Sequence, residues 1–132
     1  KNIAKTIYHR GLPYEKFEYH EDVWEKFSEI LNRAKTIGDL EEIPIIFGVL
    51  HPVTSHKPSW YSQGRIRLAA KAKSIASELG MTVYDSFEII HSLPNGPETA
   101  YSFGKAGGHH NEYGYKVVSE GLEEVIGNVL KR

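Results

Sequence analysis

Hydrophobic positions along the chain follow two kinds of spacing, and each kind predicts a different element. Apolar residues three and four positions apart predict helices over about 21–37, 59–79 and 111–129. The apolar run IPIIFGVL at 43–50 and the segment MTVYDSF at 81–87 predict strands. IPIIFGVL does not alternate with polar residues, which is typical of a parallel strand covered by helices on both faces.

The order of these elements is helix, strand, helix, strand, helix, and this alternation predicts an α/β fold with a parallel sheet. We expect three layers, α/β/α, with the sheet flanked by helices as in flavodoxin-like domains. Two strands alone bury little and leave their edges open, so we expect the chain to be the C-terminal part of such a domain. Residues 1–132 then form one domain or part of one, and residues 1–20 form an irregular arm.

The remaining strands are expected from a preceding segment or from a second chain. The only methionine is Met81, so Lys1 does not begin an open reading frame. We therefore expect the chain to have been cut from a longer one.

Composition narrows the classes of function. The net charge is −1 and no stripe of Lys and Arg is present, so we do not expect binding to nucleic acid. The longest apolar run is far shorter than the ~20 residues of a membrane span, and the N-terminus has no signal-peptide core. Without cysteine there is neither a disulfide framework nor a thiolate metal site, and the compartment stays open.

Histidines follow both predicted strands, where ligands bind in open parallel sheets. His51 and His56 follow the first strand, and His109 and His110 precede the last helix. Asn111, His56 and Trp60 are candidate binding residues. An ordinary polar loop is the better explanation of His56, and an amphipathic helix start explains Trp60 equally well. Metal binding is the rival chemistry, but adjacent histidines point in different directions and no predicted helix carries H-x-x-x-H. We predict neither a metal nor a cofactor.

The stretch HHNEYG carries the most specific signal. His109, Asn111 and Gly114 resemble the last block of the SGNH, or GDSL-like, hydrolases, which reads D-x-x-H-x-N-x-x-G before the C-terminal helix. Three of the four positions match, and the position of the family acid falls on Ala106. The broader likeness in architecture covers about residues 21–130.

This resemblance implies that His109 is the general base of a serine esterase, with His110 as the runner-up. Asn111 would cap the last helix and hold the turn that carries the base. Glu98, Glu112 or a backbone carbonyl would take the place of the acid missing at Ala106. The serine nucleophile and the oxyanion donors would lie outside this chain.

The resemblance therefore implies the C-terminal portion of an enzyme that hydrolyses acyl esters, on sugars or on lipid-like molecules. Its partners would be the small ester and the missing N-terminal half or a second chain. The alternative is a non-catalytic α/β binding module, or a degenerate relative of the hydrolases that kept only the fold.

Overall fold

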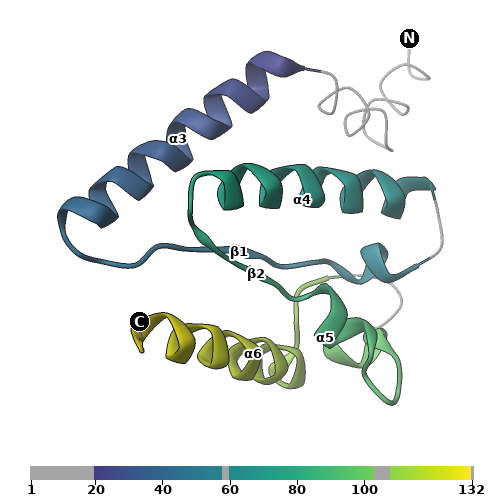
Figure 1. Ribbon diagram of the computed structural model, residues 1–132. Coiled ribbons are helices and arrows are strands. Elements are labelled where there is room, and N and C mark those ends of the chain that lie inside the picture. Colours follow the sequence, from purple (N-terminus) through teal and green to yellow (C-terminus); the bar gives the residue numbers. More distant parts are fainter. Residues whose placement is uncertain (1–19, 58–59, 103–107, 132) are drawn as a thin grey trace, which may run out of the picture.

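The chain is described by a computed structural model over residues 20–57, 60–102 and 108–131, with the side chains of 60–62 left out. The predicted arm at 1–20 lies outside the described residues except for its last position. The elements, in chain order, are α3 (Glu21–Leu40), β1 (Ile46–Val49), the 3₁₀ helix η1 (Val53–His56), α4 (Trp60–Glu78), β2 (Thr82–Asp85), α5 (Phe87–His91), η2 (Pro97–Ala100) and α6 (Glu112–Leu130) (Figure 1).

The sheet consists of β1 and β2, which pair in parallel from Ile46 opposite Thr82 to Val49 opposite Asp85. The parallel pairing of the two predicted strands is confirmed. The three-layer, flavodoxin-like fold is wrong: the described residues are mostly helical and their sheet has two strands. Each strand is only four residues long. The alternating order of helices and strands was predicted correctly, but two strands of this length do not form the wide sheet that we inferred from that order.

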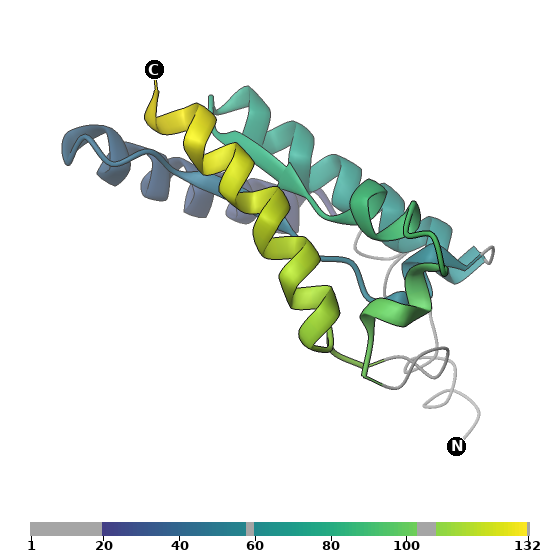
Figure 2. The ribbon, with the colours of Figure 1, turned by 90° about the horizontal axis from the view of Figure 1, so that it is seen from below.

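The helices lie on opposite sides of the strand pair. α4 runs along one side and α6 along the other, and α3 lies on the side of α4 (Figure 1). Seen from below, α6 lies in front of the two strands (Figure 2). None of the helices in the described ranges has the length and apolar character to cross a membrane.

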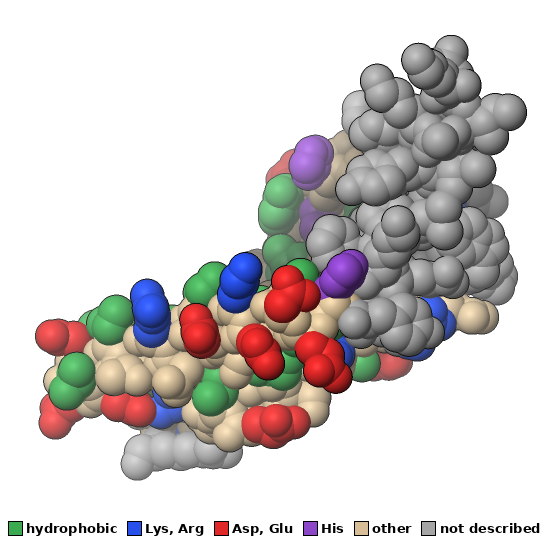
Figure 3. All heavy atoms as spheres, turned by 90° about the horizontal axis from the view of Figure 1, so that it is seen from above, with side chains coloured by type: hydrophobic (Ala, Val, Ile, Leu, Met, Phe, Trp, Pro, Cys, Tyr) green, Lys and Arg blue, Asp and Glu red, His purple; other side chains and the backbone are tan. Residues whose placement is uncertain are grey.

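The two sides are packed unequally. The buried core lies between the strands, α5 and α6, and it consists of Val53, Tyr84, Ile90, Ala100, Tyr101, Val117 and Val118. On the α3 side, large apolar side chains remain in contact with water: Ile30 is 65% and Ile37 is 62% exposed. Figure 3 views the molecule from above, and there hydrophobic side chains are interspersed with charged side chains of both signs.

Candidate functional site

A pocket of about 300 Å³ lies beyond the carboxyl end of β1. Five segments supply its walls: the end of β1, helix α4, the residues after η2, the turn before α6 and the start of α6 itself. The two histidines singled out from the sequence, His109 and His110, therefore meet His51 and Arg65 in one cavity. We call it the basic pocket, and its lining is Leu50, His51, Pro52, Arg65, Tyr101, Gly108, His109, His110 and Tyr115.

Backbone hydrogen bonds hold the turn that carries the two histidines. Tyr101 and His110 form an antiparallel bridge. The Ser102 N–H donates to the His109 carbonyl at 3.0 Å, and the Asn111 N–H donates to the Ala100 carbonyl at 3.0 Å. The two ends of the loop between residues 102 and 108 are thus tied together next to the pocket.

Asn111 fixes the same turn through its side chain. Its Oδ1 accepts from the Gly114 N–H at 2.9 Å and caps α6, as the sequence predicted. Its Nδ2 donates to the carbonyls of Thr99 at 2.8 Å and Tyr101 at 3.3 Å. Gly114 completes the arrangement, because a Cβ there would overlap the carbonyl oxygen of Ala100. Asn111 therefore acts on the backbone around the pocket and does not line it.

The rings of His109 and His110 have different surroundings. His110 stacks on Tyr101 at a centroid distance of 4.7 Å and meets the edge of Tyr115 at 5.7 Å. Burial, and to a lesser degree the charge of His109, lowers the pKa of His110. His109 is exposed, and within the described residues no carboxylate lies within ion-pair distance of it. His109 is therefore the more accessible of the two rings.

Two of the predicted substitutes for the missing acid, the carboxylates of Glu98 and Glu112, do not lie at His109 among the described residues. Neither Glu98 nor Glu112 forms an ion pair with its ring within the described part of the chain. Ala106, which occupies the position of the family acid, lies outside the described residues.

A buried charged group lies behind the basic pocket, and the sequence reasoning missed its arrangement. His51 is 5% exposed, and its Nε2 lies 3.1 Å from Oδ1 of Asp85. The same carboxylate pairs with Lys73 of α4 and accepts the Phe87 N–H at 2.9 Å. Burial alone would raise the pKa of Asp85, but the contacts with His51, Lys73 and Phe87 outweigh it and hold that pKa well below its usual range.

The strand register contains the signal that would have found this group. Asp85 is the partner of Val49 in the parallel pair, and His51 comes two residues after Val49. Residues that follow paired positions leave the sheet at the same edge, so a carboxylate and an imidazole were to be expected together there. Sequence alone did not fix that register.

His56, proposed as a binding residue, lies in a buried aromatic cluster and does not line the basic pocket. Its ring stacks on Phe87 at 4.7 Å and on His91 at 5.6 Å. Its Nε2 lies 3.3 Å from the Tyr101 hydroxyl, which donates to the His51 carbonyl at 2.5 Å. Burial, followed by the neighbouring histidines, lowers the pKa of His56 to about 4. Burial also raises the pKa of Tyr101 to about 12, so its hydroxyl stays protonated.

Trp60 begins α4, next to η1, but its side chain is among those left undescribed. A search for three or more His, Cys, Asp or Glu residues that could bind a metal together finds no such group in the described ranges.

Comparisons with protein-family models, with curated proteins and with solved structures find no match to this chain. The geometry of the basic pocket and the motif at residues 109–114 are therefore the features that bear on function.

Proposed function

We propose that this chain supplies the catalytic histidine of an SGNH-like enzyme that hydrolyses acyl esters. The observation that carries the proposal is the rigid turn at the basic pocket. Asn111 and Gly114, two of the positions that match the family motif, both have a physical role there: one caps α6 and the other allows the close approach to Ala100. Together they hold the backbone of His109 at the pocket wall.

In this proposal His109 is the general base. A serine hydroxyl is a weak nucleophile at neutral pH, so a base must accept its proton while its oxygen attacks the ester carbonyl. The imidazolium then returns the proton to the leaving alcohol, and a water molecule repeats the sequence on the acyl-enzyme. The serine is proposed to come from a preceding segment or a second chain. Arg65 in the lining suits the negative charge that develops on the carbonyl oxygen.

A second candidate is a binding module without catalysis. Among the described residues His109 has no carboxylate partner, and this favours the second candidate, because an orienting acid contributes strongly to a histidine base. The same pocket would then bind a ligand without turning it over.

Kinetic measurements on variants of the two adjacent histidines distinguish the hydrolase from the binding module. Hydrolysis of a short-chain aryl acetate is measured for the full-length protein, for His109→Ala and for the matched control His110→Ala. We expect His109→Ala to lower kcat by several orders of magnitude, because loss of the base leaves a residual advantage of only about 10³–10⁴ over water. His110→Ala should retain most of the activity.

Circular dichroism checks that both variants are folded. A folded His109→Ala variant with full activity contradicts the catalytic role. A wild-type protein that binds a carboxylate but hydrolyses no ester supports the binding module.

A further inference from the structure

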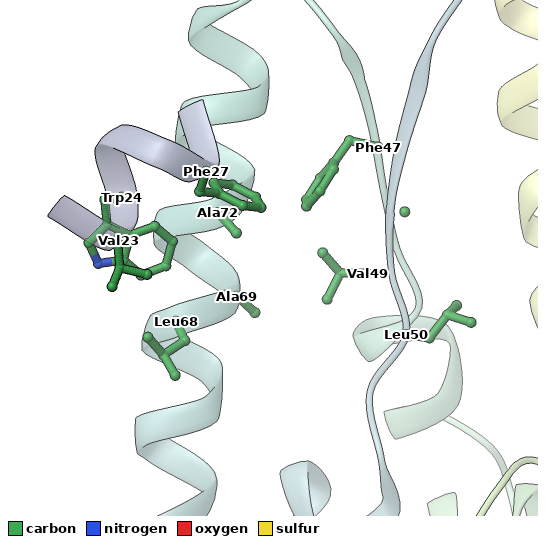
Figure 4. Close-up of a pocket in the computed structure, with 10 residues that line it drawn as sticks. Val23, Trp24, Phe27, Phe47, Val49, Leu50, Leu68, Ala69 and Ala72 are labelled. Atoms are coloured by element: carbon green, nitrogen blue, oxygen red, sulfur yellow. The ribbon is translucent and has the colours of Figure 1, made fainter. Parts of the chain in front are cut away.

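An apolar cavity lies on the other side of β1 from the core. It is a groove of about 490 Å³ between α3, β1 and α4. Its lining contains no charged residue: Val23, Trp24, Phe27, Phe47, Gly48, Val49, Leu50, Leu68, Ala69 and Ala72. We call it the apolar groove. Figure 4 shows Phe27 of α3 and Phe47 of β1 facing into it, with Ala69 and Ala72 on the wall formed by α4.

Contacts of aromatic side chains join α3 to β1 and to α4 at this groove. The rings of Phe27 and Phe47 meet edge to face at a centroid distance of 6.0 Å, and those of Trp24 and Phe27 at 5.7 Å. Lys71 of α4 lies over the indole of Trp24, with its Nζ 4.9 Å from the ring centroid. These contacts join α3 to its neighbours through side chains and leave an apolar space between them.

A smaller cavity of about 170 Å³ shares lining residues with both the apolar groove and the basic pocket. It shares Val49, Leu50, Leu68 and Ala69 with the groove. It shares Leu50, His51, Pro52 and Arg65 with the basic pocket. Leu50 lines all three cavities, which explains why this large apolar side chain stays 53% exposed. The three cavities therefore adjoin one another. We call this row of cavities the path; one end is uncharged and the other is lined by arginine and histidine.

We infer that this path binds the straight hydrocarbon chain of a carboxylic ester or acid. The methylene groups lie in the apolar groove, and the carboxyl end lies in the basic pocket near Arg65 and His109. The inference rests on the proposed function for the reaction at that end, and it adds the substrate class: esters of medium-length acyl chains. The burial of apolar surface supplies the affinity for the hydrocarbon chain, and the basic lining determines which end of the ligand lies in the basic pocket.

The first test measures binding without catalysis. Sodium hexanoate, octanoate and decanoate are titrated into the protein, and the emission of Trp24 is followed in a Trp60→Phe background, which leaves one tryptophan. Each added methylene should strengthen binding by about threefold to fourfold. Arg65→Gln should weaken the binding of decanoate but not that of 1-decanol.

Two alanines on the same helix provide a matched pair of variants. Ala72 lines the apolar groove, whereas Ala70 lines a neighbouring cavity beside Lys73 and Asp85 and none of the three cavities of the path. Ala72→Leu fills space equivalent to two or more methylenes, so it should weaken decanoate binding by about tenfold or more and hexanoate binding by less. Ala70→Leu should bind all three carboxylates like the wild type. If Ala72→Leu does not fold, Val23→Asn at the α3 wall should likewise weaken decanoate binding.

Affinity that does not depend on chain length, or equal effects of Ala72→Leu and Ala70→Leu, overturns the inference. A shift of Trp24 emission on dilution without ligand also overturns it, because a second copy of the chain would then cover the groove. Its failure is distinct from failure of the proposed function. If binding depends on chain length but no ester is hydrolysed, the inferred acyl site is supported and the proposed esterase activity is contradicted. If acetates are hydrolysed but binding does not depend on chain length, the esterase activity is supported and the acyl site is contradicted.

Discussion

Mild acid should destabilise this protein through His56. The ring is 9% exposed and stacks on Phe87 and His91, and its pKa in the folded chain is about 4 against an ordinary value of 6.5. Burial disfavours the imidazolium, and the neighbouring histidines add to the effect. Between pH 6.5 and 4 the unfolded chain therefore binds a proton that the folded chain does not. The stability due to neutral His56 is complete above pH 6.5 and is lost as the pH falls toward 4.

The two pKa values set the size of the effect. Linkage gives a loss of about 2 kcal/mol in the free energy of unfolding at pH 5 relative to pH 8, and about 3 kcal/mol once the pH is well below 4. Asp85, which faces the same cluster from the end of β2, has the opposite behaviour in a lower window. Its pKa is depressed in the folded chain, so its contribution is present above its ordinary value of 3.8 and is lost only below that pH. A comparison of pH 8 with pH 5 therefore leaves Asp85 out. His110, whose pKa is also lowered by burial, adds to the loss of stability in the same window, so a His56 variant is needed to separate the two.

Urea unfolding followed by circular dichroism at pH 8 and pH 5 measures this difference. His56→Phe keeps an aromatic ring between Phe87 and His91 but cannot take up a proton, so the pH-dependent loss should shrink by about 2 kcal/mol. His20→Gln removes an exposed histidine and should leave the loss unchanged. If His56→Phe loses as much stability at pH 5 as the wild type, the reasoning about this cluster is refuted.

Three further predictions concern stability, each measured by urea unfolding. Gly114→Ala should lower the free energy of unfolding by about 3 kcal/mol, because its Cβ would overlap the Ala100 carbonyl. Gly127→Ala has open space around it and should stabilise α6 by about 0.5–1 kcal/mol. Equal effects of the two variants would contradict the close approach at Gly114. Asn111→Ala should cost about 1–2 kcal/mol through loss of the cap, and an unchanged midpoint would exclude the capping role. Tyr84→Phe should cost about 1 kcal/mol, since its hydroxyl donates to a backbone carbonyl of α6 at 2.9 Å, and a neutral result would contradict that bond.

Local signals were sufficient to predict the main elements. Apolar residues at spacings of three and four placed three helices close to α3, α4 and α6, and the apolar run at 43–50 contained β1. Asn111 was identified as a cap because short polar side chains at a helix start satisfy free N–H groups within the same turn. Each of these features depends on residues that are neighbours in sequence.

Features that depend on distant contacts were not predicted. The pairing of His51 with Asp85 follows from the strand register, and the stacking of His56 on Phe87 follows from the way η1 packs against α5. Spacing along the chain carries no information on either contact. The wide sheet was wrong for a related reason: alternation of helices and strands indicates parallel pairing, but it does not say how many strands pair.

The bridge between Tyr101 and His110 has a consequence for how this pocket could change during evolution. The bridge and the neighbouring hydrogen bonds join the chain at Ser102 to the chain at His109. The number of residues between Ser102 and Gly108 therefore has little influence on the position of His109. Each doubling of such a loop costs only about 0.6 kcal/mol in closure entropy. New residues inserted there would leave the histidine turn in place. Protein engineers can use the same position to graft segments that select among ligands.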